Sequence, residues 1–276
     1  MLELRHQFPL ASLLKLAGLA RSTFYYQQKV LRATDKYAHL KARIQALFEQ
    51  HKGRYGYRRI TAVIQQEGNK INHKTVQRLM GELRIKSYVR VKKYRSYRGA
   101  VGKIAPNILK RQFDAEGPNQ KWVTDVTEFN VDGQKLYLSP ILDLYNGEII
   151  AYEMARRPVF NMVHSMLKKA FSKLEIHDKP ILHSDQGWQY QMPIYHRLLE
   201  QRALTQSMSR KGNCYDNAAM ESFFGTLKSE FFHLNKFNDL DQLRAGIDEY
   251  IQYYNYDRIK LKLNGLSPVQ YRTHAS

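Results

Sequence analysis

The sequence predicts an α/β catalytic domain, a mixed sheet covered by helices, preceded by small all-helical units. Helical periodicity dominates residues 1–84, whereas strand-like runs joined by tight turns begin at Lys121. The charge changes near the same point. Residues 1–111 hold 25 Lys and Arg against 5 Asp and Glu, a net charge of +20, and residues 112–276 hold 19 against 20, or −1. Such asymmetry indicates a polyanionic partner, with nucleic acid the first candidate and an acidic membrane the second.

Two short helices are expected within residues 10–26, joined by a turn at Gly18. Small helix-turn-helix units have this pattern. An amphipathic helical hairpin without a role in DNA binding fits the segment equally well.

Three further helices are expected at residues 37–50, 58–67 and 72–84, with Asn72 as the N-cap of the last one. Spacing places Lys74 and Arg78 on the outer face of that helix, as in a helix that lies along a DNA groove. Four residues crowd the turn before the middle helix, namely Arg54, Tyr57, Arg58 and Arg59. We expect residues 36–84 to bind DNA; a basic bundle that serves contacts within the protein is the alternative.

Residues 86–111 are basic and aromatic and lack helical period. We interpret them as a linker that follows DNA phosphates, with Lys92, Lys93 and Arg95 as contacts.

From Lys121 onwards, three antiparallel strands are followed by alternating helices and strands. The turns Asp132-Gly133 and Asn146-Gly147 are strong hairpin signals. The strands are expected at Lys121–Asn130, Lys135–Asp143, Glu148–Met154, a run ending at Asp185, and Leu204–Ser207. The helices are expected at Val159–Leu174, Pro193–Gln201, Asn217–Phe232 and Leu240–Tyr254. This order predicts a mixed five-stranded sheet with flanking helices, in which ligands gather where the strand ends open.

Three acidic residues occupy positions that suit a metal site. Asp125 lies inside a strand-like run among apolar neighbours, Asp185 follows a buried strand, and Glu221 lies in a later helix, with 35 residues between Asp185 and Glu221. A charge in apolar surroundings is costly unless it meets a cation. Three such carboxylates can hold a pair of hard divalent cations, which would make a phosphodiester-cutting site. A turn cap at Asp185 and a solvated helix position at Glu221 are the structural alternatives. Lys228 lies two turns after Glu221 on the same side and can meet a phosphate.

Cys214 is the single cysteine, which excludes an internal disulfide and a Cys-rich zinc site. Such cysteine usage is typical of a reducing compartment, so we expect a cytoplasmic protein. The sequence lacks the run of about 18 apolar residues that a membrane span needs, and we expect no membrane partner.

Three motifs, in order and with this D-35-E spacing, resemble the integrase core of insertion-sequence transposases. They are Trp122–Thr127, His183–Gly187 and Asn213–Lys228. The group resembled is the IS-three group, whose second reading frame encodes an OrfB-type product with a retroviral-integrase-like DDE catalytic core. The turn Arg54–Arg59 resembles that group's helix-turn-helix, and Tyr253–Arg258 with Leu266–Tyr271 resembles its C-terminal signature.

The resemblance implies a ribonuclease-H-like fold in which Asp125, Asp185 and Glu221 form the catalytic, metal-binding triad. Mg²⁺ is the implied cofactor, with Mn²⁺ as a substitute, and Lys228 is the implied contact to the DNA end. The implied activity is that of a DNA transposase, which cleaves the 3′ ends of an insertion sequence and transfers them into target DNA. The partners would be the terminal inverted repeats and the target duplex. Joining two ends requires at least two protomers, so we expect a homo-oligomer on DNA.

Together these observations predict five parts. They are an N-terminal helix-turn-helix-like segment (1–34), a second helix-turn-helix-like DNA-binding domain (35–85), a basic linker (86–117), an integrase-like catalytic core (118–235) and a C-terminal helical extension (236–276).

Two other functions compete with the transposase. A transposase-derived regulator would occupy element ends without catalysis, although an intact triad argues against it. A metal-dependent nuclease would cut without joining, using the same site. The chain has neither the His/Cys zinc domain of retroviral integrases nor an obvious leucine heptad run, so we expect the upstream-frame product as a fusion or partner.

Overall fold

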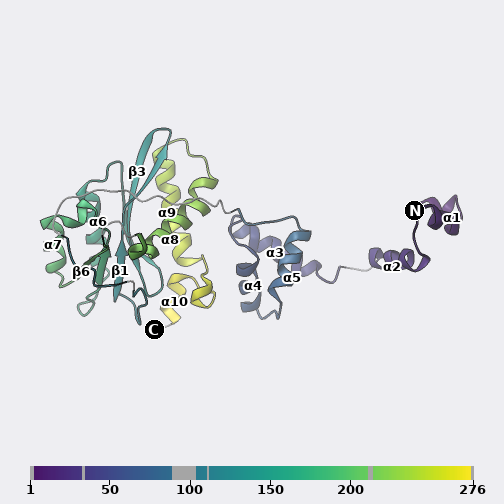
Figure 1. Ribbon diagram of the computed structural model, residues 1–276, viewed down its shortest axis with the longest axis horizontal. Helices are drawn as coiled ribbons and strands as arrows, with labels where there is room; N and C mark the ends of the chain where they lie inside the picture. The colour runs from purple at the N-terminus through teal and green to yellow at the C-terminus, as the bar shows by residue number, and fades with distance from the viewer. Residues whose placement is uncertain (1–2, 33–34, 89–103, 111, 211–213, 275–276) are drawn as a thin grey trace.

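The computed structural model describes residues 3–32, 35–88, 104–110, 112–210 and 214–274 (Figure 1). An α/β core at one end is joined to helical units at the other. No helix within these ranges is long and apolar enough to cross a membrane. The linker residues Lys92, Lys93 and Arg95 lie outside the described residues.

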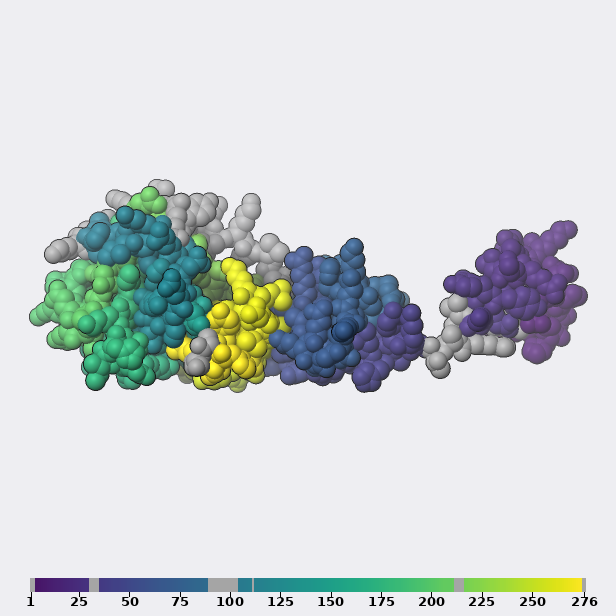
Figure 2. Space-filling model, turned by 90° about the horizontal axis from the view of Figure 1, so that it is seen from below, coloured from purple at the N-terminus to yellow at the C-terminus, as the bar shows by residue number. Residues whose placement is uncertain are grey.

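The N-terminal part is helical wherever it is described. Its elements are η1 (Glu3–His6), α1 (Leu10–Leu16), α2 (Arg21–Arg32), α3 (Ala38–Gln50), α4 (Tyr57–Gln66) and α5 (His73–Glu82). The α1–α2 pair buries Leu13, Leu14 and Phe24, and it stands apart from the rest of the chain in both views (Figures 1 and 2). The helices expected from periodicity are therefore confirmed, with ends shifted by a few residues.

Helices α3, α4 and α5 form a small bundle, called here the α3–α5 unit. Each helix turns one apolar face into a shared cluster. The buried members are Ile44, Leu47, Phe48, Tyr55, Ile60, Ile64, Val76, Leu79, Met80 and Ile259. Asn72 caps α5 as expected, because its side chain accepts a hydrogen bond of 2.8 Å from the backbone N–H of Lys74.

The core is built on one mixed sheet. Its strands are β1 (Lys121–Thr124), β2 (Thr127–Val131), β3 (Gln134–Asp143), β4 (Ile149–Ala155), β5 (Ile181–Ser184) and β6 (Thr205–Met208). Strand β3 pairs antiparallel with β4 on one side and with β1 and β2 on the other, while β1–β5 and β5–β6 are parallel. The expected mixed sheet is confirmed, and its sixth strand arises because the first expected strand is divided into β1 and β2.

The division occurs at Asp125 and has a cause across the sheet. Thr124 pairs with Ile141 and Thr127 with Leu138, so an unbroken register would place Asp125 opposite Pro140. Proline has no N–H to donate to a strand partner. The ladder is therefore interrupted where the sequence predicted a continuous strand, and Asp125 lies in the gap.

Helices cover both faces of the sheet. One apolar cluster joins the sheet to α8 (Ala218–Glu230) and α9 (Leu240–Tyr256), and a second joins its other face to α6 (Phe160–Phe171) and α7 (Pro193–Glu200). Figure 1 shows these two pairs on opposite sides. Short elements complete the core, namely η2 (Trp188–Gln191), η3 (Cys214–Asn217), η4 (Phe232–Leu234), η5 (Leu261–Leu263) and α10 (Pro268–His274).

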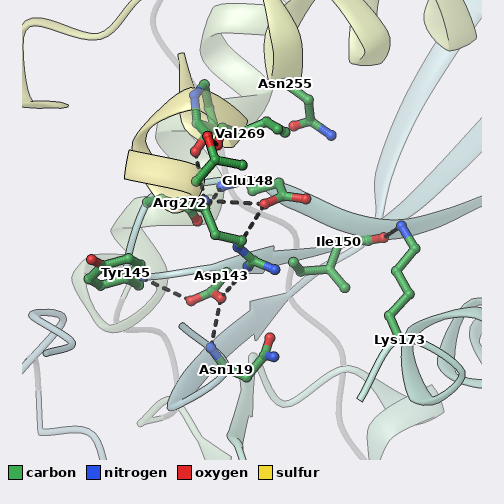
Figure 3. Close-up of polar contacts among 12 residues, drawn as sticks. Asn119, Asp143, Tyr145, Glu148, Ile150, Lys173, Asn255, Val269 and Arg272 are labelled. Atoms are coloured by element: carbon green, nitrogen blue, oxygen red, sulfur yellow. Dashed lines mark hydrogen bonds and ion pairs between the residues drawn. The ribbon is translucent and has the colours of Figure 1, made fainter. Parts of the chain in front are cut away.

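The C-terminal segment closes onto the turn between β3 and β4 (Figure 3). Asp143 is fully buried and accepts hydrogen bonds from the backbone N–H groups of Asn119 and Tyr145. Arg272 of α10 donates to the Asp143 carboxylate at 2.8 Å and lies 3.1 Å from Glu148. Asp143 thus has a structural role at the β3–β4 turn.

Replacing Arg272 with alanine should lower the free energy of unfolding by about 2 kcal/mol, because it removes the cation beside a buried carboxylate. Arg272 is 26% exposed, so the loss should fall short of that for a fully buried pair. Urea denaturation measures the difference. The matched control is Arg156→Ala, whose 3.9 Å contact with Asp241 is exposed and should contribute less than about 0.5 kcal/mol. Equal losses in the two variants would contradict this role.

Candidate active site

Asp125 and Asp185 lie side by side because two parallel strands end together. Val123 of β1 pairs with His183 of β5, and each aspartate follows two residues later. The Oδ1 atom of Asp125 accepts a hydrogen bond of 2.7 Å from the N–H of Val126, and that of Asp185 accepts one of 2.8 Å from Gly187. The chain leaving β5 thus folds back on the Asp185 carboxylate.

Gly187 is required by this close approach. A Cβ atom at that position would lie 2.9 Å from Oδ1 of Asp185 and 3.1 Å from the side-chain oxygen of Gln189. Contacts shorter than 3.0 Å are essentially unknown for Cβ atoms. The glycine in the Asp185-Gln186-Gly187 turn therefore lets the backbone hold the carboxylate in place.

Glu221 reaches the same end of the sheet from the first turn of α8. The start of this helix is tied to β1, because the side-chain amide of Asn217 donates a hydrogen bond of 3.2 Å to the carbonyl of Thr124. Glu221 is half-buried, and its charge acts on Asp125. Asn217 belongs to the Asn213–Lys228 motif and precedes Glu221 by four residues, which places both on one face of the helix. Sequence analysis assigned no separate role to Asn217.

Burial and mutual repulsion dominate the electrostatics of these carboxylates. Burial raises the pKa of Asp125 well above its ordinary value, and the charges of Asp185 and Glu221 raise it further, whereas the Val126 N–H and Lys228 lower it. Burial also raises the pKa of Asp185 and of Glu221. Half-buried carboxylates that repel one another fit a site for a cation.

The donor set fits a hard divalent metal ion, because all three groups offer carboxylate oxygens. The structure brings the groups to one end of the sheet without closing them into a ligand sphere. Within the described ranges, no cluster of three or more His, Cys, Asp or Glu side chains is arranged to hold a metal ion. The assignment of Asp125, Asp185 and Glu221 as ligands therefore stays a prediction.

His183 is a buried neighbour to which sequence analysis gave no role. Its ring nitrogens lie 2.8 Å from the hydroxyl of Ser207 and 3.0 Å from that of Ser209. Burial lowers the pKa of His183 to about 4, so the ring is neutral near pH 7. Through these two hydrogen bonds His183, two residues before Asp185, connects β5 to β6 and to Ser209, the residue that follows β6.

Lys228 lies beside the carboxylates, on the same helix as Glu221. Its Nζ atom donates a hydrogen bond of 2.7 Å to the hydroxyl of Thr127 and lies 5.2 Å from the centre of the Phe129 ring. Lys228 and Glu221 both lie on α8, seven residues apart, and contact between Lys228 and DNA stays a prediction.

The other residues predicted to bind DNA fall into two groups. Arg58, Lys74 and Arg78 are exposed, and Tyr57 is half-buried with its ring stacked on His73. Arg78 also pairs with Glu82 one turn later. By contrast, Arg54 is buried and Arg59 half-buried, and both donate hydrogen bonds to Glu230 of the core. Arg54 and Arg59 thus make contacts within the protein, which was the alternative to DNA binding for this basic bundle.

An open groove runs beside the exposed group. It lies between α4, the α4–α5 turn and the C-terminal segment at Leu261, and Arg58, Lys70 and His73 line it together with polar side chains. Apolar side chains line the groove as well, among them Ile71 and Leu261, but the positive charges of Arg58 and Lys70 suit a DNA backbone.

These features define an enzyme with an integrase-type core joined to a helical DNA-binding unit. Family models agree: two models described as "Integrase core domain" match residues 115–214 and 221–275, and one described as "HTH-like domain" matches residues 35–93.

Two curated relatives from Escherichia coli K12 extend over nearly the whole chain. The putative transposase InsK of IS150 is 57% identical over 270 residues, covering 98% of this chain and 95% of the relative. The transposase InsF of IS3A is 33% identical over 276 residues, covering 97% and 96%. The chain therefore belongs to the insertion-sequence transposases with an integrase core, and it is a DDE-type polynucleotidyl transferase.

Among solved structures, the catalytic core domain of HTLV-2 integrase, in complex with magnesium, is 17% identical with a TM-score of 0.43, and the match covers 57% of this chain and 98% of that one. Membership of the family rests on the sequence relatives and the family models.

Changing Asp125 to asparagine should stabilise the protein when divalent metal is removed by a chelator. Asparagine keeps the oxygen that accepts from the N–H of Val126 and removes a half-buried charge that repels Asp185. Because the pKa of Asp125 is raised on folding, protonation favours the folded state. The advantage of Asp125→Asn should therefore be absent below about pH 4, grow as the pH rises, and reach about 1 kcal/mol or more at pH 7.

Thermal unfolding followed across this pH range measures the effect. Asp132→Asn, in the exposed β2–β3 turn, serves as the control with the same chemical change. An Asp125→Asn variant that is less stable than the wild type at pH 7 would contradict the electrostatic account.

Proposed function

We propose that this transposase cleaves the 3′ ends of an insertion sequence and joins them to target DNA, with Asp125, Asp185 and Glu221 as its catalytic residues. The observation that carries the proposal is the placement of two half-buried, mutually repelling aspartates at adjacent strand ends. Glu221 supports it, because the Asn217–Thr124 bond ties the start of its helix to the strand that precedes Asp125.

The three carboxylates would hold two Mg²⁺ ions, for which Mn²⁺ can substitute. Bound there, the ions would lower the pKa of the attacking water or 3′-hydroxyl and stabilise the leaving oxygen. The protein's own part is to hold the carboxylate oxygens in fixed positions: the N–H of Gly187 orients Asp185, and the N–H of Val126 orients Asp125. Lys228, next to Thr127, would contact a phosphate near the cleaved end.

The basic N-terminal residues would bring the terminal inverted repeats and the target duplex to this site. Arg58, Tyr57, Lys74 and Arg78 are proposed as contacts of the α3–α5 unit, and Lys92, Lys93 and Arg95 as contacts of the linker. The exposure of Arg58 and Lys74 beside an open groove supports the first set. Arg54 and Arg59 are assigned a different role below.

The division of the chain into residues 1–34, 35–85, 86–117, 118–235 and 236–276 belongs to the same proposal. Because two element ends must be joined, a homo-oligomer is proposed to assemble on DNA, with the upstream-frame product as a fusion or partner. The protein would act in the cytoplasm, on the nucleoid.

Each of the changes Asp125→Asn, Asp185→Asn and Glu221→Gln should abolish cleavage while leaving the affinity for DNA largely intact. The assay uses a labelled duplex that bears the element's end, with Mg²⁺ or Mn²⁺, and resolves nicked and joined strands. Asp132→Asn is the matched control and should retain activity.

The products distinguish the competing functions. Joined product that is lost in Glu221→Gln supports the transposase, nicks without joining favour a nuclease, and binding without either product favours a regulator. In that last case, adding the upstream-frame product tests whether the catalytic frame needs it. Loss of DNA binding in all three carboxylate variants would contradict the metal-site assignment.

The affinity for DNA should fall steeply with salt, because the Lys and Arg residues of the N-terminal part would pair with DNA phosphates and release the counterions bound there. Lys74→Gln should reduce the slope of log affinity against log salt by about one and weaken all sequences alike. Fluorescence anisotropy at several salt concentrations measures both quantities. Lys168→Gln, an exposed change on α6 of the core, is the control. An equal change of slope in the control would contradict the assignment of the phosphate contacts to the N-terminal part.

A further inference from the structure

Two of the family motifs, far apart in the sequence, meet in space. The turn Arg54–Arg59 precedes and begins α4, and the tail Tyr253–Arg258 ends α9. Both pack against the C-terminal end of α8, where Glu230 is 4% exposed. Figure 2 shows the C-terminal segment, in yellow, next to the α3–α5 unit, in blue.

Glu230 is the centre of this contact. Its carboxylate accepts two hydrogen bonds from Arg258, of 2.8 and 2.7 Å, and one of 3.0 Å from the hydroxyl of Tyr250. A fourth, of 3.2 Å, comes from Arg59 of α4. Burial alone would raise the pKa of Glu230, but the bonds and charge of Arg258, with the charge of Arg59, outweigh it and hold the pKa below its usual value.

Arg54 adds a second bond to the same helix end. Its Nε atom donates to the backbone carbonyl of Glu230 at 3.2 Å, and its guanidinium lies 4.6 Å from the centre of the Tyr253 ring. The last carbonyl groups of a helix lack partners within the helix and carry partial negative charge. An arginine from the α3–α5 unit therefore caps α8.

Neighbouring contacts make this a fixed joint. Tyr55 is fully buried, its hydroxyl donates to the carbonyl of Asp257 at 3.0 Å, and it accepts from the N–H of Ile259 at 2.9 Å. The side chain of Ile259 lies in the apolar cluster of the α3–α5 unit. The unit and the core thus share hydrogen bonds and a hydrophobic contact.

Helix α8 connects this joint to the carboxylates. Glu221 lies in its first turn and Glu230 is its last residue, so the two are about 13.5 Å apart along the helix axis. Buried side chains between them hold α8 in the core, among them Phe223, Phe224 and Leu227. A rotation or shift imposed at Glu230 is therefore carried to Glu221 by a packed helix.

We propose that Arg59 and Arg54 are positioning residues, which couple the placement of the DNA-binding α3–α5 unit to the placement of Glu221 through Glu230 and α8. This inference rests on the proposed role of Glu221. It gives the two arginines a function other than contact with DNA, and it makes the seating of the DNA-binding unit a condition for assembling the three carboxylates.

Arg59→Gln in the full chain is the direct test, because Arg258 and Tyr250 still bind Glu230 in this variant. We expect the turnover number for cleavage at saturating DNA to fall about 10- to 100-fold, as for a small misplacement of a reacting group. The affinity for DNA and its salt slope should stay at wild-type values. Without DNA, the Mn²⁺ concentration that gives half of the maximal rise in melting temperature should increase several-fold.

The matched control is Arg43→Gln, which breaks an arginine–glutamate pair with Glu67 inside the α3–α5 unit, away from α8. It should leave turnover and the Mn²⁺ midpoint unchanged. Arg59→Lys keeps a cation beside Glu230 and should recover most of the loss. Circular dichroism at the assay temperature establishes that each variant is folded, which separates positioning from unfolding.

Two results would overturn the inference. One is an Arg59→Gln variant that matches Arg43→Gln in turnover and in its Mn²⁺ midpoint. The other is a variant that loses affinity and about one unit of salt slope while turnover at saturation is kept, which is the signature of a DNA contact. If the wild type fails to cleave even after the upstream-frame product is added, the proposed function fails, and the Mn²⁺ midpoint still decides whether Arg59 acts on the carboxylates.

Discussion

Repulsion between the half-buried carboxylates of Asp125 and Asp185 is the constraint on which the catalytic part of the protein depends. Two parallel strands hold these like charges side by side, and one backbone N–H group bonds to each. Their raised pKa values mean that ionisation opposes folding until a cation arrives. Apolar clusters on both faces of the sheet offset that cost.

The two ends of helix α8 differ in how far positive charge balances their carboxylates. At its first turn, Glu221 adds a negative charge to a site that already has two. At its last residue, a single carboxylate is shared by Arg258 and Arg59. The carboxylate at the last residue is thus paired in the folded protein, while the carboxylates near the first turn are proposed to be completed by a cation. Helix α8 can therefore be held firmly at Glu230 while the position of Glu221 still responds to what binds there.

Sequence patterns predicted most helices and strands within a few residues, because periodicity and Asp-Gly or Asn-Gly turns are local signals. Helix α10 was missed although it has such a signal: Ser267 and Gln270 bond to each other's backbone N–H as a capping box. The gap at Asp125 required knowing that Pro140 lies opposite, which only the hairpin register reveals. The positions of Arg54 and Arg59 were beyond local patterns, since their partner Glu230 is more than 170 residues away.

The contact of Arg272 with Asp143 has a consequence for the order of folding. These residues are 129 positions apart, and the β3–β4 turn is made long before α10 during synthesis. Until α10 docks, Asp143 lacks its cation, so the hairpin remains incompletely stabilised while most of the chain emerges. Contacts of such long range slow folding. A chain interrupted shortly before Arg272 would contain all three carboxylates and still have an unfinished core, which favours its removal by proteolysis over the survival of an active fragment.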